Sequence, residues 1–530
     1  MCYIISMKHF AILISLTTVM HLVGAIESFA LAEVSEVSVV VTPEPSHSTQ
    51  LNAVPNRAPN SMPYKPSGEV GVPWEPEHLA QGRIPLQPWW DWMYKPEITG
   101  TKNYVCNTGD DLNDGLTPET AKQSFASFVE THKTLGAGDA ILFCKDGYWE
   151  INKHNYLFGN GCSVDAMCTI GTYGDGDRPH IHNTGGGLEF KAGANNPVDG
   201  IYWDGLEMTG LGKDISGSEG FRIWDNVHHI VWNDMYVHDF RIGWNVSLGT
   251  AEDGLINSHF AWTNNVSTDS LHGVLAGVSD VFLDGNYFDN TGESYHSRGI
   301  YLSGLAEKKL AEYGWPVASN HIVQRNTITR NALNSEGQCS GAHYTTHGRV
   351  NGTMLIDNHF YEKQGTAGNG CWGLTVDRGR TMEWGIESFE DTVISGNKLT
   401  YLGNLHLGLS GAPGALITHN EIRMDIEGRS SGGIIIPDKT ETPFATPSIN
   451  VTAQYNKIWM EGTNNNNPIY TNGIHIGALD NVAETFKYEH NIVYKSEESQ
   501  VCYRIADIAY QAVGTNQCLM IVNGGDKLVH

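Results

Sequence analysis

Side chains that could perform acid–base chemistry beside an anionic group gather between residues 296 and 380. The candidates in this segment are Tyr301, Asp377, His296, His343, His347, Arg298, Arg349, Arg378 and Arg380. An imidazole or a phenol can take up and return a proton, and a guanidinium can bind a carboxylate through two parallel hydrogen bonds. β-Elimination of a uronate needs these functions: a base for the proton beside the carboxylate, a positive group for that carboxylate and an acid for the leaving oxygen.

A repeated structural unit would position these side chains. From about residue 200 onward an asparagine recurs among apolar residues at spacings of 23 to 40 residues, at Asn233, Asn257, Asn286, Asn326, Asn358, Asn397, Asn420, Asn456 and Asn491. Asparagine tolerates a left-handed or bend conformation, and stacked asparagines can form hydrogen-bonded ladders. A repeat that keeps its core and varies its loops is typical of a solenoid. We therefore expect the asparagines from Asn286 to Asn420 to align at equivalent turns.

A second phrase, glycine followed by an apolar residue and then alternation, opens most coils, at Gly273, Gly299, Gly373, Gly433 and Gly473. Because alternate residues of a strand face opposite sides, the residue after the glycine should face the core and the next one should face outward. With Gly341 as the opening glycine of its coil, His343 falls beside Tyr301, at the strand spacing of about 4.8 Å. The same alignment predicts that Cys339 and Cys371 lie within disulfide reach.

This alignment suggests roles for the side chains. His343 is the predicted base and Tyr301 the predicted acid, or Tyr301 performs both steps. Arg298 or Arg378 is expected to bind the substrate carboxylate. The remaining predicted substrate contacts lie on the outward rows or in the flanking turns, at His296, His347, Arg349 and Asp377. A histidine in such a repeat is more often an exposed or ladder residue than a catalyst, and His406 and His475 are expected to be ordinary surface residues.

The start of the repeat region has a motif of its own. Tyr104-Val105-Cys106 predicts a strand, turns follow up to Gly115, and Thr117 is the expected N-cap of a helix with Pro118 in its first position. That helix should end at Gly136 or Gly138, before a strand over 140–144. Together with the coils, this opening resembles the N-terminal cap of secreted right-handed parallel β-helix proteins, the pectate-lyase-like superfamily. The resemblance covers roughly residues 101–510. It implies an all-β solenoid with an N-terminal cap containing one helix, and an extended polysaccharide as substrate.

The resemblance does not select one reaction. The leading hypothesis is a polysaccharide lyase that acts on an alginate-like or pectin-like polymer. A C5-epimerase shares the first chemical step, and a non-catalytic glycan-binding solenoid also fits the pattern. A glycoside hydrolase would use Asp377 and Asp438, which are two coils or roughly 10 Å apart. The carboxylates of Glu383, Glu387, Glu390 and Asp391 could bind calcium, although the favoured interpretation of this segment is a solvated loop.

The chain divides into four parts. Residues 1–32 have a basic start, an apolar middle and a small-residue cleavage site, which together predict a signal peptide. Residues 33–100 hold eleven of the twenty prolines and are expected to be a linker or wrapping segment. The aromatic end of that segment, Pro88 to Tyr94, is interpreted as an apolar plug, with a sugar-stacking platform as the alternative. Residues 101–180 would form the cap, and residues 181–530 the β-helix with its C-terminal cap.

Composition agrees with an exported monomer acting on a glycan. The net charge of −26 argues against nucleic acid and anionic membranes as partners, so an acidic polysaccharide would need a locally basic face. Apart from Cys2 in the predicted signal, eight cysteines remain, and an even number in an exported chain favours disulfides. The sequence alone leaves their connectivity open, and pairing of sequence neighbours in order is one arrangement. We expect a secreted or periplasmic location, and no zinc site, because no C-x-x-C motif occurs.

Overall fold

The computed structural model describes residues 88–528, except for residues 186, 192–195, 248, 251–254, 293–296, 378–384, 428, 438–445, 464–470, 478–484, 506–507, 511–513 and 523–524. The predicted signal peptide and most of the proline-rich segment therefore lie outside the described residues. The helical elements are η3 (Pro88–Met93), η4 (Pro118–Thr120), α2 (Phe125–His132) and α3 (Glu307–Tyr313). In the described part of the chain, no helix is long and apolar enough to cross a membrane.

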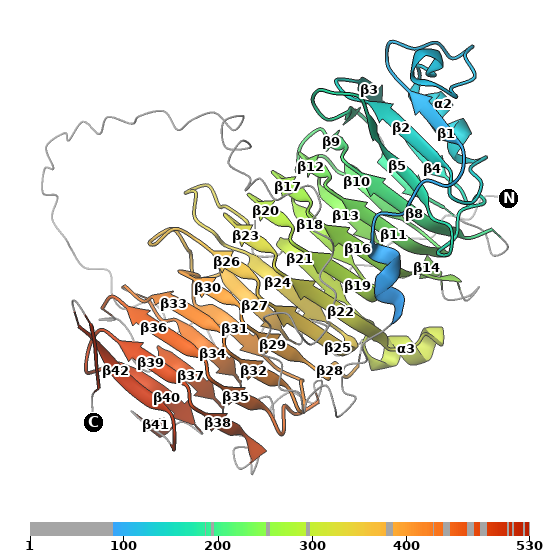
Figure 1. Ribbon diagram of the computed structural model, residues 1–530. Helices are drawn as coiled ribbons and strands as arrows, with labels where there is room; N and C mark the ends of the chain where they lie inside the picture. Colours follow the sequence, from blue (N-terminus) through green and yellow to red (C-terminus); the bar gives the residue numbers. More distant parts are fainter. Residues whose placement is uncertain are drawn as a thin grey trace, which may run out of the picture. The chain divides into compact units, whose positions relative to one another are not determined.

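Three sheets, which we call A, B and C, build the solenoid (Figure 1). Sheet A consists of β1 (Lys102–Val105), β2 (Ala140–Cys144), β5 (Cys168–Tyr173), β8 (Val198–Asp204), β11 (Val227–Asn233), β16 (Ser258–Thr263), β19 (Ser279–Asp284), β22 (Ala318–Gln324), β25 (Arg349–Ile356), β28 (Ser388–Glu390), β29 (Val393–Ser395), β32 (Leu416–Thr418), β35 (Thr452–Gln454) and β38 (Lys487–Glu489). Sheet B consists of β3 (Tyr148–Ile151), β6 (His180–Asn183), β9 (Glu207–Thr209), β12 (Tyr236–His238), β17 (Val266–Thr268), β20 (Tyr287–Asp289), β23 (Thr327–Thr329), β26 (His359–Tyr361), β30 (Lys398–Thr400), β33 (Glu421–Asp425), β36 (Lys457–Glu461), β39 (Ile492–Lys495), β42 (Gln517–Val522) and β43 (Gly525–Leu528).

Sheet C consists of β4 (His154–Leu157), β7 (Gly187–Phe190), β10 (Glu219–Ile223), β13 (Ile242–Val246), β18 (His272–Ala276), β21 (Arg298–Ser303), β24 (Ala342–His347), β27 (Trp372–Val376), β31 (Leu405–Leu409), β34 (Gly432–Ile436), β37 (Asn472–Ile476), β40 (Val501–Ile505) and β41 (Ile508–Tyr510). β14 (Gly249–Thr250) and β15 (Leu255–Ile256) form a separate antiparallel pair. The chain passes from sheet A to B to C and repeats, and strands of successive coils pair in parallel. This confirms the predicted right-handed parallel β-helix.

The N-terminal cap has its strands where they were predicted, but its helix is divided. The Thr117 side chain accepts a hydrogen bond from the backbone N–H of Thr120, as an N-cap should. The turn that it starts, η4, is only three residues long, because Lys122 then returns to pair with Val105. A new N-cap, Ser124, starts α2. The prediction of a single helix from Thr117 onward is therefore wrong at its start, because the α-helix begins only at Phe125.

An asparagine ladder runs along the turn between sheets A and B. The members of the ladder are Asn265, Asn286, Asn326, Asn358, Asn397, Asn420, Asn456, Asn491 and Asn516. Each side chain after the first accepts hydrogen bonds from the backbone N–H and the side-chain amide of the ladder asparagine before it. The predicted alignment of the asparagines from Asn286 to Asn420 is thus confirmed. Asn233 and Asn257, which share the sequence phrase, are not members. The left-handed conformation belongs to the residue before the ladder asparagine, for example Arg325 and His419, and not to the asparagine itself.

The interior of the solenoid is apolar, and one outer face is apolar too. The inward side chains include four fully buried tryptophans, Trp203, Trp232, Trp244 and Trp262. A second apolar cluster, which includes Tyr202, Val231, Ala261, Phe282 and Ile322, runs along the outward side of sheet A. Trp92 and Met93 of η3 are buried against this cluster, and the ribbon of η3 crosses sheet A in Figure 1. The interpretation of the aromatic segment as an apolar plug is therefore correct.

All eight predicted disulfide cysteines are paired with their neighbours in sequence, as Cys106–Cys144, Cys162–Cys168, Cys339–Cys371 and Cys502–Cys518. The Cys339–Cys371 bond confirms the pairing predicted from the coil alignment, with 5.2 Å between the two Cα atoms. Cys339, however, is not part of β24. It lies in the turn before this strand, where it forms an isolated bridge with Ala367. The disulfide therefore does not report the register of the strand that follows it.

Candidate active site

The outward face of sheet C carries the predicted catalytic tyrosine and arginine. In β21, Tyr301 faces outward and pairs with Leu275 of the preceding coil and Thr345 of the next one. Arg298, three residues earlier on the same strand, donates a 3.0 Å hydrogen bond from Nε to Thr345 Oγ1. Burial lowers the pKa of the Arg298 guanidinium, while its interaction with Tyr301 opposes that shift.

His347, rather than His343, is the imidazole beside Tyr301. The two ring centroids lie 5.4 Å apart. Nδ1 of His347 lies 2.6 Å from the carbonyl oxygen of Asp377, and it must be the donor because a carbonyl can only accept. In the neutral ring Nε2 then carries the lone pair and can accept a proton. The arrangement therefore supplies a potential general base next to the phenol.

His343 does not lie beside Tyr301, so the predicted catalytic pair is wrong. Arg298 pairs with Ala342 and Tyr301 pairs with Thr345, which shifts β24 by two residues from the predicted register. His343 occupies the row of the opening glycine Gly299, and its side chain is fully buried. The first residues of these strands do not alternate: Gly299 and the residue after it are both buried, and a Cβ on Gly299 would come within 2.9 Å of the interior side chain of Ile328.

His406 shares this row and this burial. Its Nδ1 contacts the carbonyl of Gly432 at 3.2 Å and its Nε2 contacts the carbonyl of Arg423 at 3.1 Å. The expectation of a surface position for His406 is therefore wrong, and both buried histidines use their ring nitrogens to satisfy polar groups inside the solenoid. His475 is half-buried on the outward row that contains Tyr301.

The remaining predicted site residues are placed as follows. Asp377 follows β27 in the outward row of His347, and its Oδ1 accepts a 2.7 Å hydrogen bond from Ser410 Oγ. Arg349 begins β25, just past the corner after His347, with a buried Nε that has no hydrogen-bond partner. Five predicted residues lie outside the described part of the chain. They are the substrate contacts His296 and Arg378, the neighbouring Arg380, the hydrolase carboxylate Asp438 and the calcium ligand Glu383.

The other predicted calcium ligands do not form a group. Glu387 is buried, whereas Glu390 is exposed on β28 and Asp391 is half-buried in the bend after it. In the described part of the chain, the one cluster with metal-ligand spacing lies elsewhere and contains no member of this set. Calcium binding here remains a prediction without a described site.

Sequence reasoning missed two hydroxyls and a second polar cluster on the same face. Thr345 and Thr375 hydrogen-bond to each other at 2.9 Å beneath Arg298. A threonine does not stand out as a site residue in the sequence until the pairing of the strands is known. Nearer the N-terminus, Glu189 accepts a 2.7 Å hydrogen bond from Trp224 Nε1, and the Arg222 guanidinium stacks on that indole at 3.9 Å. These residues come from coils that the sequence alignment did not include.

Glu219 belongs to that second cluster. Its Oε1 accepts a 3.1 Å hydrogen bond from Asn245 Nδ2, and Arg222 Nε lies 3.5 Å from its Oε2. Burial raises the pKa of the Glu219 carboxyl, and the nearby charge of Glu189 adds to the effect. A carboxyl with a raised pKa near a second acidic side chain is the combination that a glycoside hydrolase needs.

A histidine cluster on sheet B is a less suitable acid–base centre. His238 lies between two carboxylates, 2.7 Å from Asp239 Oδ2 and 3.2 Å from Glu207 Oε1. Although burial acts in the opposite direction, hydrogen bonds to these carboxylates raise the pKa of His238 to about 9. The imidazole is therefore protonated at neutral pH and cannot act as a base.

This ion cluster leads to a pH prediction. Because the pKa of His238 is raised from 6.5 to about 9 on folding, its stabilising effect should be complete below pH 6.5 and lost as the pH rises through 9. We expect the difference in unfolding free energy between the parent and His238→Gln to shrink over this range, as measured by urea titration at several pH values. A difference that grows with pH would contradict the assignment.

The coiled sheets and the polar outward face of sheet C define the protein as a parallel β-helix with a candidate site on its surface. No family model and no curated protein matches the chain. Among solved structures, it is similar to the GH136 lacto-N-biosidase of Eubacterium ramulus, with 14% identity over 74% of this chain and 68% of that one and a TM-score of 0.42. It is also similar to the pectate lyase Pel9A (13% identity, 79% and 80% covered, TM-score 0.34).

A third similar structure is the A-module of the mannuronan C-5 epimerase of Azotobacter vinelandii, with 13% identity over 80% of this chain and 100% of that module and a TM-score of 0.33. The names of these three proteins describe a hydrolase, a lyase and an epimerase. The likeness therefore does not select a reaction for this chain, and the chemistry has to be inferred from its own residues.

Proposed function

We propose that the protein is a secreted carbohydrate-active enzyme that cleaves a uronate-containing, alginate-like or pectin-like polysaccharide by β-elimination. The observation that carries the proposal is the convergence of Tyr301, Arg298 and His347 on the outward face of sheet C. A long polymer can lie along this face, because every coil adds one strand of about 4.8 Å to it. The strongly negative chain thus presents a locally basic group to an acidic substrate.

Each side chain has one role in this mechanism. Arg298 binds the substrate carboxylate and stabilises the negative charge that develops when the adjacent proton leaves. His347 Nε2 accepts that proton, since its Nδ1 already donates to the Asp377 carbonyl. Tyr301 donates a proton to the leaving glycosidic oxygen. The predicted roles of Tyr301 and Arg298 are thus retained, and His347 takes the role first assigned to His343.

Glycoside hydrolysis is the second candidate, and it is favoured by the Glu219 and Glu189 pair. The raised pKa of Glu219 suits a general acid, and Glu189 suits the carboxylate that works opposite it. Both oxygens of Glu189 are engaged, by Trp224 and by His154, which makes this pair the weaker candidate. An epimerase would share the proton abstraction of the lyase but would leave the polymer uncut.

A panel of alginate, polygalacturonate and neutral glycans separates these candidates. For a lyase we expect new ultraviolet absorbance from unsaturated uronate products together with a falling polymer length. New reducing ends without that absorbance would indicate the hydrolase and contradict the elimination mechanism. Solvent-hydrogen exchange into an uncut polymer would indicate the epimerase.

A further inference from the structure

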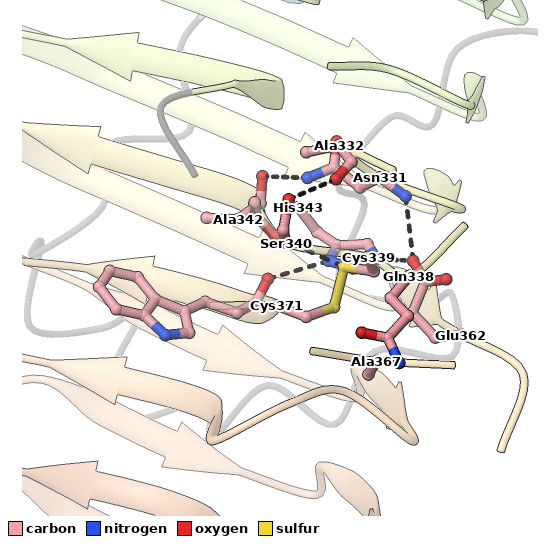
Figure 2. Close-up of a disulfide and its surroundings, with 12 residues drawn as sticks. Asn331, Ala332, Gln338, Cys339, Ser340, Ala342, His343, Glu362, Ala367 and Cys371 are labelled. Atoms are coloured by element: carbon pink, nitrogen blue, oxygen red, sulfur yellow. Dashed lines mark hydrogen bonds and ion pairs between the residues drawn. A yellow bond between two sulfur atoms is a disulfide. The ribbon is translucent and has the colours of Figure 1, made fainter. Parts of the chain in front are cut away.

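A buried cluster of four potential metal ligands lies inside the solenoid, behind the outward face of sheet C. Cys339, His343, Glu362 and Cys371 each place a ligand atom within 4.8 Å of the others, and all four side chains are buried. Cys339 and Cys371 form a disulfide. Figure 2 shows His343 and Glu362 beside its sulfur atoms. The mechanism proposed above uses none of these residues.

The hydrogen bonds of His343 leave a lone pair aimed at Glu362. Nδ1 of His343 lies 2.9 Å from the carbonyl oxygen of Trp372, so Nδ1 is the donor. Nε2 of the neutral ring is then an acceptor, and it lies 2.9 Å from Glu362 Oε1. Two acceptor atoms at this distance need a proton or a cation between them. Histidines that bind metals in proteins usually donate their second ring N–H to a carbonyl or carboxylate, as His343 does.

The neighbouring coil shows that the turn after a sheet B strand does not need an ionisable pair such as His343 and Glu362. Glu362 Oε1 accepts a 3.0 Å hydrogen bond from the backbone N–H of Asn331. One coil earlier, the neutral amide of Asn331 accepts a 2.7 Å hydrogen bond from Thr291 Oγ1. In the row of His343, most other coils have glycine, including Gly299 and Gly373. A histidine and a carboxylate are thus added to the solenoid interior where two successive coils carry the two cysteines.

We propose that a zinc ion and the disulfide are alternative occupants of this cluster. Reduction by an external dithiol breaks the sulfur–sulfur bond and adds two electrons and two protons, while the dithiol becomes its own disulfide. The two thiols then lose their protons, and the thiolates, His343 Nε2 and Glu362 Oε1 bind Zn²⁺ as four ligands; the proton shared by His343 and Glu362 is released. Two sulfur ligands, one nitrogen and one oxygen suit tetrahedral zinc.

The ligand set also explains why the absence of C-x-x-C was misleading. The two sulfur ligands are 32 residues apart in sequence, and the stacking of coils brings them together. In the part of the chain that the structure describes, the other three disulfides belong to no such group of ligands. They therefore serve as internal controls. The zinc site is independent of the proposed activity, because it lies in the core and not on the outward face.

The first test uses an oxidised variant. Cys339→Ser frees Cys371 while the other three disulfides can still form, so one thiolate, His343 and Glu362 remain as ligands. Added Co²⁺, a spectroscopic substitute for zinc, should bind at about one ion per chain and give a thiolate-to-cobalt charge-transfer band. His343→Ala in the same background should weaken binding by at least about tenfold. Cys502→Ser frees Cys518, which among the described residues belongs to no group of metal ligands, and should give no band.

Two results would overturn the proposal: no band in a folded Cys339→Ser protein, or an equal band in Cys502→Ser. If Cys339→Ser does not fold, the full chain produced in a reducing compartment with zinc provides the second measurement. About one zinc per chain is expected in the parent and in Cys502→Ser/Cys518→Ser, and none in Cys339→Ser/Cys371→Ser. A zinc-free reduced parent would equally overturn the proposal.

Discussion

Tyr301→Phe is expected to lower kcat/KM on the cleaved polysaccharide by about 10²–10⁴-fold, the usual contribution of a general acid or base. The change removes only the hydroxyl, so the packing of the ring beside His347 should persist. Activity is measured from the unsaturated product, and far-ultraviolet circular dichroism verifies that the β-helix is intact.

The matched control is Tyr287→Phe. Tyr287 is also a half-buried, outward-facing tyrosine, but it lies on sheet B, where its hydroxyl hydrogen-bonds to Asp289 at 3.4 Å. We expect its turnover to stay close to that of the parent. Near-normal activity in Tyr301→Phe on a substrate that the parent cleaves would refute the site. The Glu189 and Glu219 cluster would then be the next place to substitute.

The second large effect concerns the asparagine ladder. Asn326→Ala should lower the free energy of unfolding by about 3–5 kcal/mol, because each buried group left without a partner costs about 1–3 kcal/mol. The backbone N–H of Asn286 would lose the Asn326 side-chain oxygen at 3.0 Å, and the carbonyl of Leu283 would lose the amide at 3.0 Å. Denaturant titration of the purified protein measures the change.

Asn233→Ala is the control for the ladder. Asn233 carries the same sequence phrase, but it is only half-buried at the end of β11, where its amide donates a 2.7 Å hydrogen bond to Asp204. We expect it to cost about 1 kcal/mol or less. If the two substitutions lowered the free energy of unfolding equally, membership of the ladder would not explain the stabilisation by Asn326.

The fold could be predicted because its main devices depend on residue type. Few side chains other than asparagine can accept two hydrogen bonds and donate to the next coil from a buried turn, so Asn326 and Asn358 mark the repeat wherever the loops vary in length. The glycine at the second position of β18 and β21 is similarly constrained, since a Cβ on Gly273 would collide with Phe288. The disulfide of Cys339 followed from the stacking of coils alone.

The site could not be predicted in full, because it depends on how β24 pairs with β21, and the repeat of opening glycines does not specify this pairing. Counting from Gly341 assumed that every coil opens with glycine and alternates from there, yet β24 has His343 in the glycine row and its first residues do not alternate. In the actual register Thr345 pairs with Tyr301, and His347, two residues further along β24, places its ring beside that tyrosine. The sequence by itself therefore determined a parallel β-helix with stacked asparagines, cysteine pairs and a tyrosine–arginine strand. Only the tertiary structure decided which histidine faces outward beside Tyr301 and which is buried, because the backbone bend at the strand start, and not residue type, sets that direction.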